Sequence, residues 1–223
     1  MGAATPAFGK LTNLSMPEMI TAKLRAAIAD GVLADGQQLV EPEVAAGFGV
    51  SRGTVREAMQ RLVQEGLLTS FAHRGVFVTE ISPDDIVDIY NARRAIETSA
   101  ALNLASSPDS TVLDSLRKEY MTMARSVDTG DSAELTRADQ RFHEILVASL
   151  RNSRLERMSE TFLVQTRQCI ARLEGKYALP HEAVDEHLDI ISAIESGDSS
   201  EVLLSINRHM DGAIALLTAP TPV

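Results

Sequence analysis

The sequence predicts a mainly α-helical protein in two parts, an N-terminal winged helix-turn-helix of three helices and a β-hairpin wing, followed by an antiparallel bundle of six helices. Three observations predict this fold. Apolar residues recur at helical spacing in the first 65 residues, the period changes to two between residues 67 and 79, and the chain after Pro83 is helical again. No run of residues in that last part is typical of a strand.

Glycine and proline delimit the first three helices. Apolar residues at helical spacing predict a first helix over residues 16–30, and Gly31 is placed to end it. After a turn at residues 33–36, a second helix begins near Pro42, because proline suits the first turn of a helix. The third helix is predicted from about residue 52 to residue 65.

A β-hairpin follows the third helix. Residues 67–71 and 75–79 have a period of two and flank Ala72-His73-Arg74, so the hairpin has a basic tip. Ser82-Pro83 then marks the boundary between the two parts, because the residue before a proline is pushed out of helical geometry.

Six amphipathic helices are predicted after this boundary, and the segments that join them are short. Short connections between long helices imply an antiparallel bundle. The predicted helices cover residues 84–106, 109–128, 131–150, 152–174, 180–197 and 199–218.

Composition is that of a globular protein with two modest cores. The 223 residues are 44% hydrophobic. No apolar run approaches the ~20 residues of a membrane helix, and the N-terminus lacks the pattern of a signal peptide, so we expect a cytoplasmic protein with no membrane partner. Cys169 is the only cysteine, which excludes an intramolecular disulfide and a cysteine-built metal cluster.

The net charge of −10 is unevenly distributed along the chain. Residues 1–80 carry seven Lys and Arg against eight Asp and Glu, whereas residues 81–223 carry fourteen against twenty-three. The first part is therefore close to neutral and can hold a basic face, which contact with DNA phosphates requires.

The predicted third helix has the character of a DNA-reading helix. Arg52 and Arg56 are four residues apart and share one face. Arginine donates to guanine O6 and N7, so we expect these two side chains to reach bases in the major groove. The alternative is a solvated face on which Arg56 or Arg61 pairs with Glu57 or Glu65. The other expected DNA contacts are backbone contacts from Ser51, Thr54 and Arg61, and a wing tip formed by His73, Arg74 and Gly75.

A second constellation lies in the helical part. Asp139 and His143 form a D-x-x-x-H pattern, so both project from one helical face about one turn apart. His187 and His209 lie in the middle of the fifth and sixth predicted helices of the bundle. Imidazoles and a carboxylate suit Zn²⁺, Ni²⁺ or Mn²⁺, and a bundle interior can bring them together. The alternative is three ordinary histidines with unrelated partners.

Arg93 allows two interpretations. It can pair with Glu97 one turn further along the same helix, as many bundle arginines do. A buried arginine can instead bind a carboxylate ligand through two hydrogen bonds. The sequence alone leaves both open.

With these residues the chain resembles the GntR superfamily of bacterial transcription regulators, in its FadR-type branch with an all-helical FCD effector domain. Residues 49–58 match the recognition segment of that family, residues 74–78 match its wing, and residues 139–143 match its D-x-x-F-H motif. His187 and His209 fall where the family has its two remaining metal-binding histidines. Six helices in the second part, where other members have seven, resemble the VanR-like subgroup.

The resemblance implies a ligand-responsive regulator and not an enzyme. A homodimer would bind a palindromic double-stranded DNA operator, and repression is the expected direction of regulation. A divalent metal, zinc with nickel or manganese as alternatives, would help to hold a small carboxylate effector, and Arg93 would engage the effector's carboxylate. The implied division is a mobile arm at 1–15, a DNA-binding domain at 16–80, a linker at 81–83, an effector-binding and dimerisation domain at 84–218 and a tail at 219–223.

Two other functions stay open at this point. The bundle could be a metal-dependent hydrolase fused to a DNA-binding head, although the spacing of Glu144, Asp185 and Glu186 assigns none of them the task of general base. The metal could also be purely structural, with four protein ligands closing its coordination shell.

Overall fold

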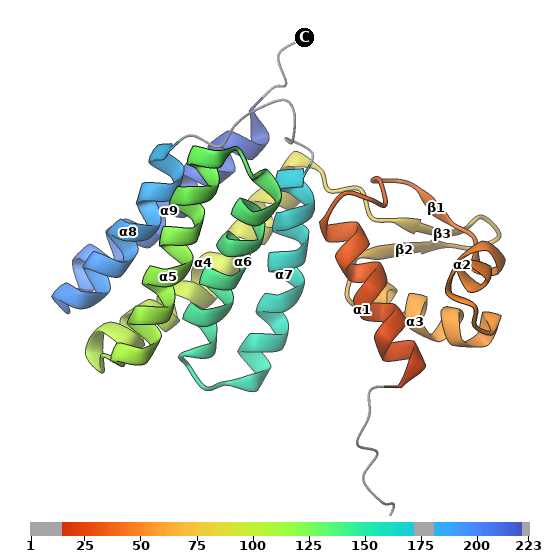
Figure 1. Cartoon of the computed structure of the whole chain (residues 1–223), viewed down its shortest axis with the longest axis horizontal. Coiled ribbons are helices and arrows are strands. Elements are labelled where there is room, and N and C mark those ends of the chain that lie inside the picture. The colour runs from red at the N-terminus through yellow and green to blue at the C-terminus, as the bar shows by residue number, and fades with distance from the viewer. Residues whose placement is uncertain (1–14, 172–180, 220–223) are drawn as a thin grey trace, which may run out of the picture.

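The computed structural model describes residues 15–171 and 181–219. All of the predicted arm except Ser15, the predicted helix ends at residues 174 and 180, and most of the predicted tail lie outside these ranges. The described chain forms two units (Figure 1). The N-terminal unit consists of α1 (Met16–Ala29), β1 (Gln38–Leu39), α2 (Glu41–Phe48), α3 (Arg52–Gln64), β2 (Leu68–Phe71) and β3 (Gly75–Val78). The second unit consists of α4 (Pro83–Ser106), α5 (Ser110–Thr129), α6 (Ser132–Ala148), α7 (Ser153–Ala171), α8 (His181–Ser196) and α9 (Ser199–Thr218).

The N-terminal unit is a winged helix-turn-helix, as predicted. The turn between α2 and α3 depends on Gly49, which ends α2 in the left-handed conformation with φ 67°. Ser51 then caps α3, because its hydroxyl accepts a hydrogen bond from the Thr54 backbone N–H at 3.2 Å. The buried face of α3 packs on α1, so its polar face is left for solvent or a partner.

The sheet of this unit has one strand more than the predicted hairpin. Its strand order is β1-β3-β2, and both pairings with β3 are antiparallel. The extra strand consists of only Gln38 and Leu39, which pair with Phe77 and Val76. Two residues are too few to produce a period-two pattern, so the prediction of a two-stranded hairpin was incomplete.

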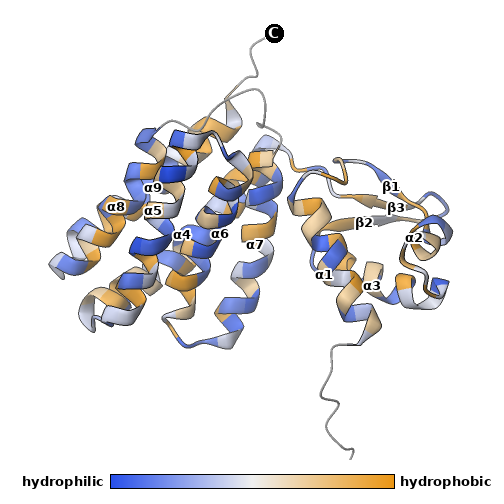
Figure 2. Cartoon of the chain, viewed as in Figure 1, coloured by the Kyte–Doolittle hydropathy of each residue, from blue (hydrophilic) through white to orange (hydrophobic). Residues whose placement is uncertain are grey.

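The second unit is the predicted bundle of helices. Figure 2 shows hydrophobic and hydrophilic residues interspersed along its helices, as amphipathic packing requires. Ser82 is extended (φ −77°, ψ 166°), as the residue before a proline usually is, and it caps α4 together with Asp85. The bundle has its own hydrophobic core, in which α4 packs on α9 and α5 packs on α6. No helix in the described ranges is long and apolar enough to cross a membrane.

One bundle helix also contacts the N-terminal unit. Figure 1 shows α7 on the side of the bundle nearest to α1, and the two helices are in contact. Val164 of α7 is buried in the core of the N-terminal unit, and Arg167 forms an ion pair with Asp30. The buried Gln168 donates to Asp35 Oδ1 at 2.6 Å and to the Thr79 backbone carbonyl at 3.0 Å. The two units are therefore joined by packed side chains as well as by the chain itself.

Candidate metal centre and DNA-binding surface

Three histidines from three helices meet inside the bundle. His143 comes from α6, His187 from α8 and His209 from α9, and all three are buried. One nitrogen of each ring lies within 4.8 Å of the corresponding nitrogens of the other two. The structure therefore brings together three of the four residues predicted as metal ligands, in a group that could hold a metal ion.

The other nitrogen of each ring has an oxygen partner. His143 Nδ1 lies 2.6 Å from Glu97 Oε2, His187 Nδ1 lies 3.2 Å from the Val184 carbonyl, and His209 Nδ1 lies 3.2 Å from Glu186 Oε2. Because these oxygens accept hydrogen bonds, each neutral ring carries its proton on Nδ1 and has a lone pair on Nε2. Metal-ligating histidines usually have such an oxygen partner at the second nitrogen.

Two of these lone pairs lack a protein donor. The buried Nε2 atoms of His143 and His187 have no hydrogen-bond partner among the described residues. Asp139 Oδ1 nevertheless lies 3.2 Å from Nε2 of His187 and 3.7 Å from Nε2 of His143. A carboxylate and two imidazole lone pairs repel one another unless a proton or a metal cation lies between them. These donors fit a divalent metal.

Electrostatics in the cluster favour a cation. Burial opposes ionisation of Asp139, but hydrogen bonds and positive charge from the imidazoles of His143 and His187 outweigh it and hold the pKa of Asp139 well below its usual range. A metal cation between the same groups would act in the same direction. Burial and the neighbouring His187 and His143 lower the pKa of His209 well below its usual value, so this ring stays neutral. Asp139 is thus a carboxylate and His209 a neutral imidazole, which are the forms that bind metals.

Glu97 links the histidines to Arg93. Arg93 Nε donates to Glu97 Oε1 at 2.8 Å, while the other oxygen of Glu97 contacts His143, and the side chains of Arg93 and Glu97 are only 1% and 0% exposed. Burial opposes ionisation of Glu97, but Arg93 and His143 lower its pKa to about 2. Helical spacing predicts the pairing of Glu97 with Arg93 but not its contact with His143, which lies 46 residues further along the chain.

Arg93 also retains unused hydrogen-bonding capacity. Its Nη1 donates to Thr166 Oγ1 of α7 at 3.2 Å, and its guanidinium lies 4.9 Å from the centre of the Tyr90 ring. Its Nη2 is buried and has no hydrogen-bond partner in the described part of the chain. Both interpretations of Arg93 therefore have support, because it pairs with Glu97 and still keeps donors for a ligand.

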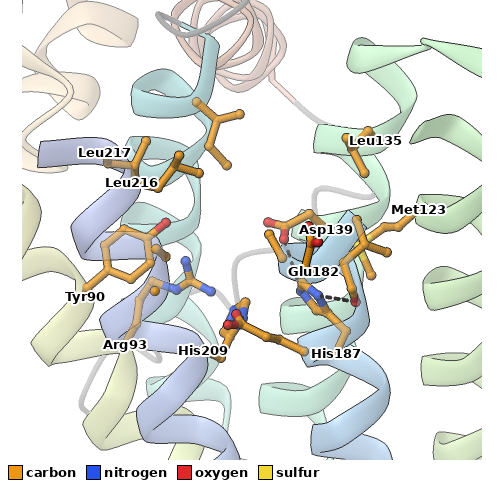
Figure 3. Close-up of a pocket in the computed structure, with 16 residues that line it drawn as sticks. Tyr90, Arg93, Met123, Leu135, Asp139, Glu182, His187, His209, Leu216 and Leu217 are labelled. Atoms are coloured by element: carbon orange, nitrogen blue, oxygen red, sulfur yellow. Dashed lines mark hydrogen bonds and ion pairs between the residues drawn. The ribbon is translucent and has the colours of Figure 1, made fainter. Parts of the chain in front are cut away.

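A cavity of about 350 Å³ adjoins the histidines. Figure 3 shows Arg93, Asp139, His187 and His209 around it, with Tyr90, Leu135, Leu216 and Leu217 further along its walls. The volume is within the range of small-molecule sites. The cavity therefore combines a polar end at the metal-binding residues with an apolar remainder.

The predicted DNA-binding residues lie in two places on the N-terminal unit. Ser51, Arg52, Thr54 and Arg56 belong to the start of α3, and Arg61 lies in its last turn. Arg56 pairs with Glu41 at 2.7 Å, and the side chain of Arg56 is 60% exposed. Arg61 pairs with Glu57 at 2.8 Å, as the alternative interpretation allowed, whereas the pairing of Arg56 with Glu41 was not foreseen.

The wing tip is the turn between β2 and β3. His73 has φ 61° and Gly75 has φ 108°, so the turn uses the left-handed conformation twice. Arg74 lies over Phe71, with 5.4 Å from its guanidinium carbon to the ring centre, and its backbone carbonyl accepts a hydrogen bond from Gln38 Nε2 at 2.8 Å. Strand β1, which the sequence did not indicate, thus supports the wing.

Comparison with known proteins agrees with this geometry. The FCD domain family matches residues 88–212, and the family described as bacterial regulatory proteins, gntR family, matches residues 17–78. The chain belongs to the GntR family, with an FCD domain. It is a DNA-binding transcriptional regulator, and its family is not one of enzymes. The FCD match contains Arg93, Glu97 and all three clustered histidines.

Individual relatives extend over most of the chain. The gluconate operon transcriptional repressor of Bacillus licheniformis is 28% identical over 208 residues, which cover 90% of this chain and 84% of that protein. The Nta operon transcriptional regulator of Aminobacter aminovorans is 28% identical over 189 residues, 82% of this chain and 87% of that protein.

Solved structures show the same fold. A GntR transcriptional regulator from Rhodococcus sp. RHA1 has a TM-score of 0.80 at 24% identity and covers 92% of this chain and 98% of its own. E. coli McbR/YncC has a TM-score of 0.81 at 19% identity, with the same coverage. Membership of the VanR-like subgroup stays a prediction.

Proposed function

We propose that this regulator is a homodimeric, metal-dependent repressor that binds a small organic carboxylate in its bundle and changes its affinity for a palindromic operator in response. The observation that carries the proposal is the contact of Asp139 with the lone pairs of His143 and His187. The gluconate operon relative is named a repressor, which supports the direction of regulation. Such a protein acts in the cytoplasm, where the chromosome is.

Asp139, His143, His187 and His209 would hold the metal. Neutral imidazoles and a carboxylate suit Zn²⁺ first, and Ni²⁺ or Mn²⁺ next. Glu97, the Val184 carbonyl and Glu186 would orient the three rings through their Nδ1 atoms. The bound ion would supply positive charge at the polar end of the cavity, to which an effector carboxylate is attracted.

Arg93 would bind the same carboxylate. Its Nη2 is a charged donor without a partner in the described chain, and leaving such a group unpaired inside a protein is costly. Its contacts with Glu97 and Thr166 keep the guanidinium in place, so little conformational entropy is lost when a ligand binds.

The DNA contacts follow the helix-turn-helix pattern. Arg52 and Arg56 would contact bases from the start of α3, and Ser51, Thr54 and Arg61 would contact the phosphate backbone. His73, Arg74 and Gly75 would form the wing contact with the backbone or the minor groove. Arg56 would exchange Glu41 for DNA at little cost, since exposed ion pairs contribute about 0–1 kcal/mol.

Helix α7 would carry the signal between the two units. Thr166 accepts a hydrogen bond from Arg93, and Gln168, two residues later, bridges to the N-terminal unit. An effector that binds Arg93 and changes its position would therefore shift α7, the helix that contacts the N-terminal unit, here called the DNA-binding head. Two heads must match two half-sites on one duplex face, so a small rotation would weaken binding.

The test begins with metal content. Protein expressed without added metal is analysed for bound elements, then loaded with Zn²⁺, and its affinity is measured for an operator selected from random DNA, with and without a panel of carboxylates. We expect a stoichiometric ion and a carboxylate-dependent change in affinity. His187→Ala should lose the ion and the response but retain basal DNA binding. His181→Ala is the matched control, because His181 is 64% exposed and lies outside the cluster. Full metal occupancy in His187→Ala would contradict the assignment.

A purely structural ion is the alternative function for the same residues. Four protein ligands would complete a tetrahedral shell and leave no position for an effector. In that case a chelator would lower the thermal unfolding temperature, while no carboxylate would change operator affinity.

A further inference from the structure

The walls of the effector cavity differ sharply between its two ends. Its charged groups in the described ranges are Arg93, Asp139, Glu182 and Glu186, and Figure 3 shows the first three near His187 and His209. The remaining wall is mainly aliphatic, with contributions from α5 to α9. Its apolar residues include Met123, Leu135, Ile170, Val184, Leu216 and Leu217.

The aliphatic wall disfavours ligands that carry many hydroxyl groups. Met123, Leu135 and Val184 are buried and offer no side-chain donor or acceptor. A ligand hydroxyl placed against them loses its hydrogen bonds to water and gains none to the protein, so its burial weakens binding. An alkyl or aromatic group at the same place buries apolar surface on both sides and is favoured.

Charge at the polar end limits the ligand to one carboxylate. Among the residues that the structure describes, one cation, Arg93, and three carboxylates, those of Asp139, Glu182 and Glu186, line the cavity. A divalent ion would bring this set of four to a formal total of zero, with the histidines neutral. One ligand carboxylate would contact the ion and the free Nη2 donor of Arg93 directly and bring this total to −1, whereas a second would bring it to −2 and would meet either Glu182 and Glu186 or the aliphatic wall.

The volume sets the size of the ligand body. About 350 Å³ is the space of roughly a dozen water molecules at ~30 Å³ each. An acid with a single aromatic ring or a branched alkyl chain fits this space, whereas acetate would leave most of the aliphatic wall uncovered.

We infer that the effector is a monocarboxylate with an apolar aromatic or branched aliphatic body, and neither a polyhydroxy acid nor a dicarboxylate. This inference rests on the proposed function of the cavity, because it takes the carboxylate to bind at the metal and Arg93. It goes beyond the proposed function in specifying the body of the ligand, which the residues at the metal do not contact.

The test compares four acids on the same Zn²⁺-loaded, full-length protein. Phenylacetate and 4-methylpentanoate represent the inferred class, gluconate the polyhydroxy acids and succinate the dicarboxylates. Binding is measured by calorimetry and by the change in operator affinity. We expect the first two to bind at least about tenfold more tightly than the last two, a difference within reach of one well-filled apolar pocket.

The outcomes separate the inference from the proposed function. Binding of gluconate or succinate as tight as that of phenylacetate would overturn the inference and leave the proposed function standing. If none of the four acids binds the Zn²⁺-loaded protein or changes operator affinity, while other carboxylates do, the inference alone fails. If no carboxylate of a broad panel has either effect, the proposed function fails as well.

A variant pair tests the aliphatic wall itself. Leu216→Ser places a hydroxyl in the wall at a half-buried position, and we expect roughly tenfold weaker binding of phenylacetate with unchanged Zn²⁺ content. Leu204→Ser on the same helix is the matched control, because Leu204 is 60% exposed and does not line the cavity. Unchanged phenylacetate affinity in Leu216→Ser would overturn the inference, since the ligand body would then lie elsewhere.

Discussion

The two units of this protein use charge in opposite ways. On the DNA-binding head, Arg56 and Glu41 pair at the surface, where their side chains are 60% and 26% exposed. In the bundle, Arg93 and Glu97 pair with side chains that are 1% and 0% exposed. An exposed pair contributes about 0–1 kcal/mol and is easily exchanged for another partner, whereas breaking a buried pair from one side costs about 3–5 kcal/mol.

The two kinds of ion pair suit the different tasks of the two units. A DNA-binding head that binds and releases phosphates needs cationic side chains whose ion pairs within the protein are weak enough to be exchanged for DNA. A bundle that must hold three imidazoles at fixed orientations needs carboxylates that stay where they are, and Glu97 is fixed by Arg93 on one oxygen and by His143 on the other. Helix α7 connects the two units. Thr166 accepts a hydrogen bond from Arg93 in the bundle, and Gln168 donates one to Asp35 in the head.

Removing a charge from the bundle should have the strongest effect on stability. Glu97→Ala leaves Arg93 and His143 without their shared carboxylate inside the core, and we expect a loss of about 3–5 kcal/mol in the free energy of unfolding. Urea unfolding of the metal-free protein measures it. Glu57→Ala, which removes an exposed partner of Arg61 on the head, should cost less than about 1 kcal/mol. Equal losses of unfolding free energy in the two variants would show that burial does not make the ion pairs of the bundle stronger than those of the head.

Removing an arginine from the head should lower operator affinity but leave the free energy of unfolding nearly unchanged. Arg52→Ala or Arg56→Ala removes a proposed base contact worth about 1–3 kcal/mol, so operator affinity should fall by roughly tenfold to a hundredfold. Because both side chains are exposed, the free energy of unfolding should change little, and so should the association of the proposed dimer. Footprints and unfolding curves measured on the same preparations check both statements, and an unchanged footprint would contradict the base contacts.

Much of this organisation could be predicted from the sequence because it depends on local spacing. The helices have clear periods and caps, and Asp139 and His143 are four residues apart on one helix, which brings them to the same face without any knowledge of the fold. His187 and His209 have no such local relation to them. Their residue type grouped them with Asp139 and His143 as candidate ligands, and the family resemblance then assigned all four to one site. The packing of α8 on α9 brings the rings of His187 and His209 together.

What the sequence did not indicate are contacts between distant, polar residues. Glu97 reaches His143 across 46 positions, and Gln168 reaches Asp35 across 133. No periodicity encodes such pairs, because each depends on how two elements pack after both have formed. The pairing of Arg56 with Glu41 has the same origin, since the turn between α2 and α3 places the starts of the two helices close enough for this contact.

The junction between the units offers a smaller test. Gln168→Ala removes two hydrogen bonds to the head, at roughly 1 kcal/mol each, so we expect faster hydrogen exchange in α1 and in residues 33–37 by about one order of magnitude. The helices α5 and α6 should exchange as before. Glu160→Ala, at an exposed position of the same helix, is the control. If exchange in the head is unchanged, the covalent link rather than α7 holds the two units together.

The smallest expected effect concerns the partner that Arg56 must leave. Glu41→Gln removes a negative charge beside the proposed DNA surface and weakens an exposed ion pair, so the free energy of unfolding should change by less than about 1 kcal/mol. Operator affinity should rise by a few-fold at low salt, because the arginine is released and a charge that repels phosphate is gone, and this gain should shrink as salt is added. A fall in affinity would mean that Glu41 holds Arg56 in its DNA-binding position, in which case the head would share the fixed charge arrangement of the bundle.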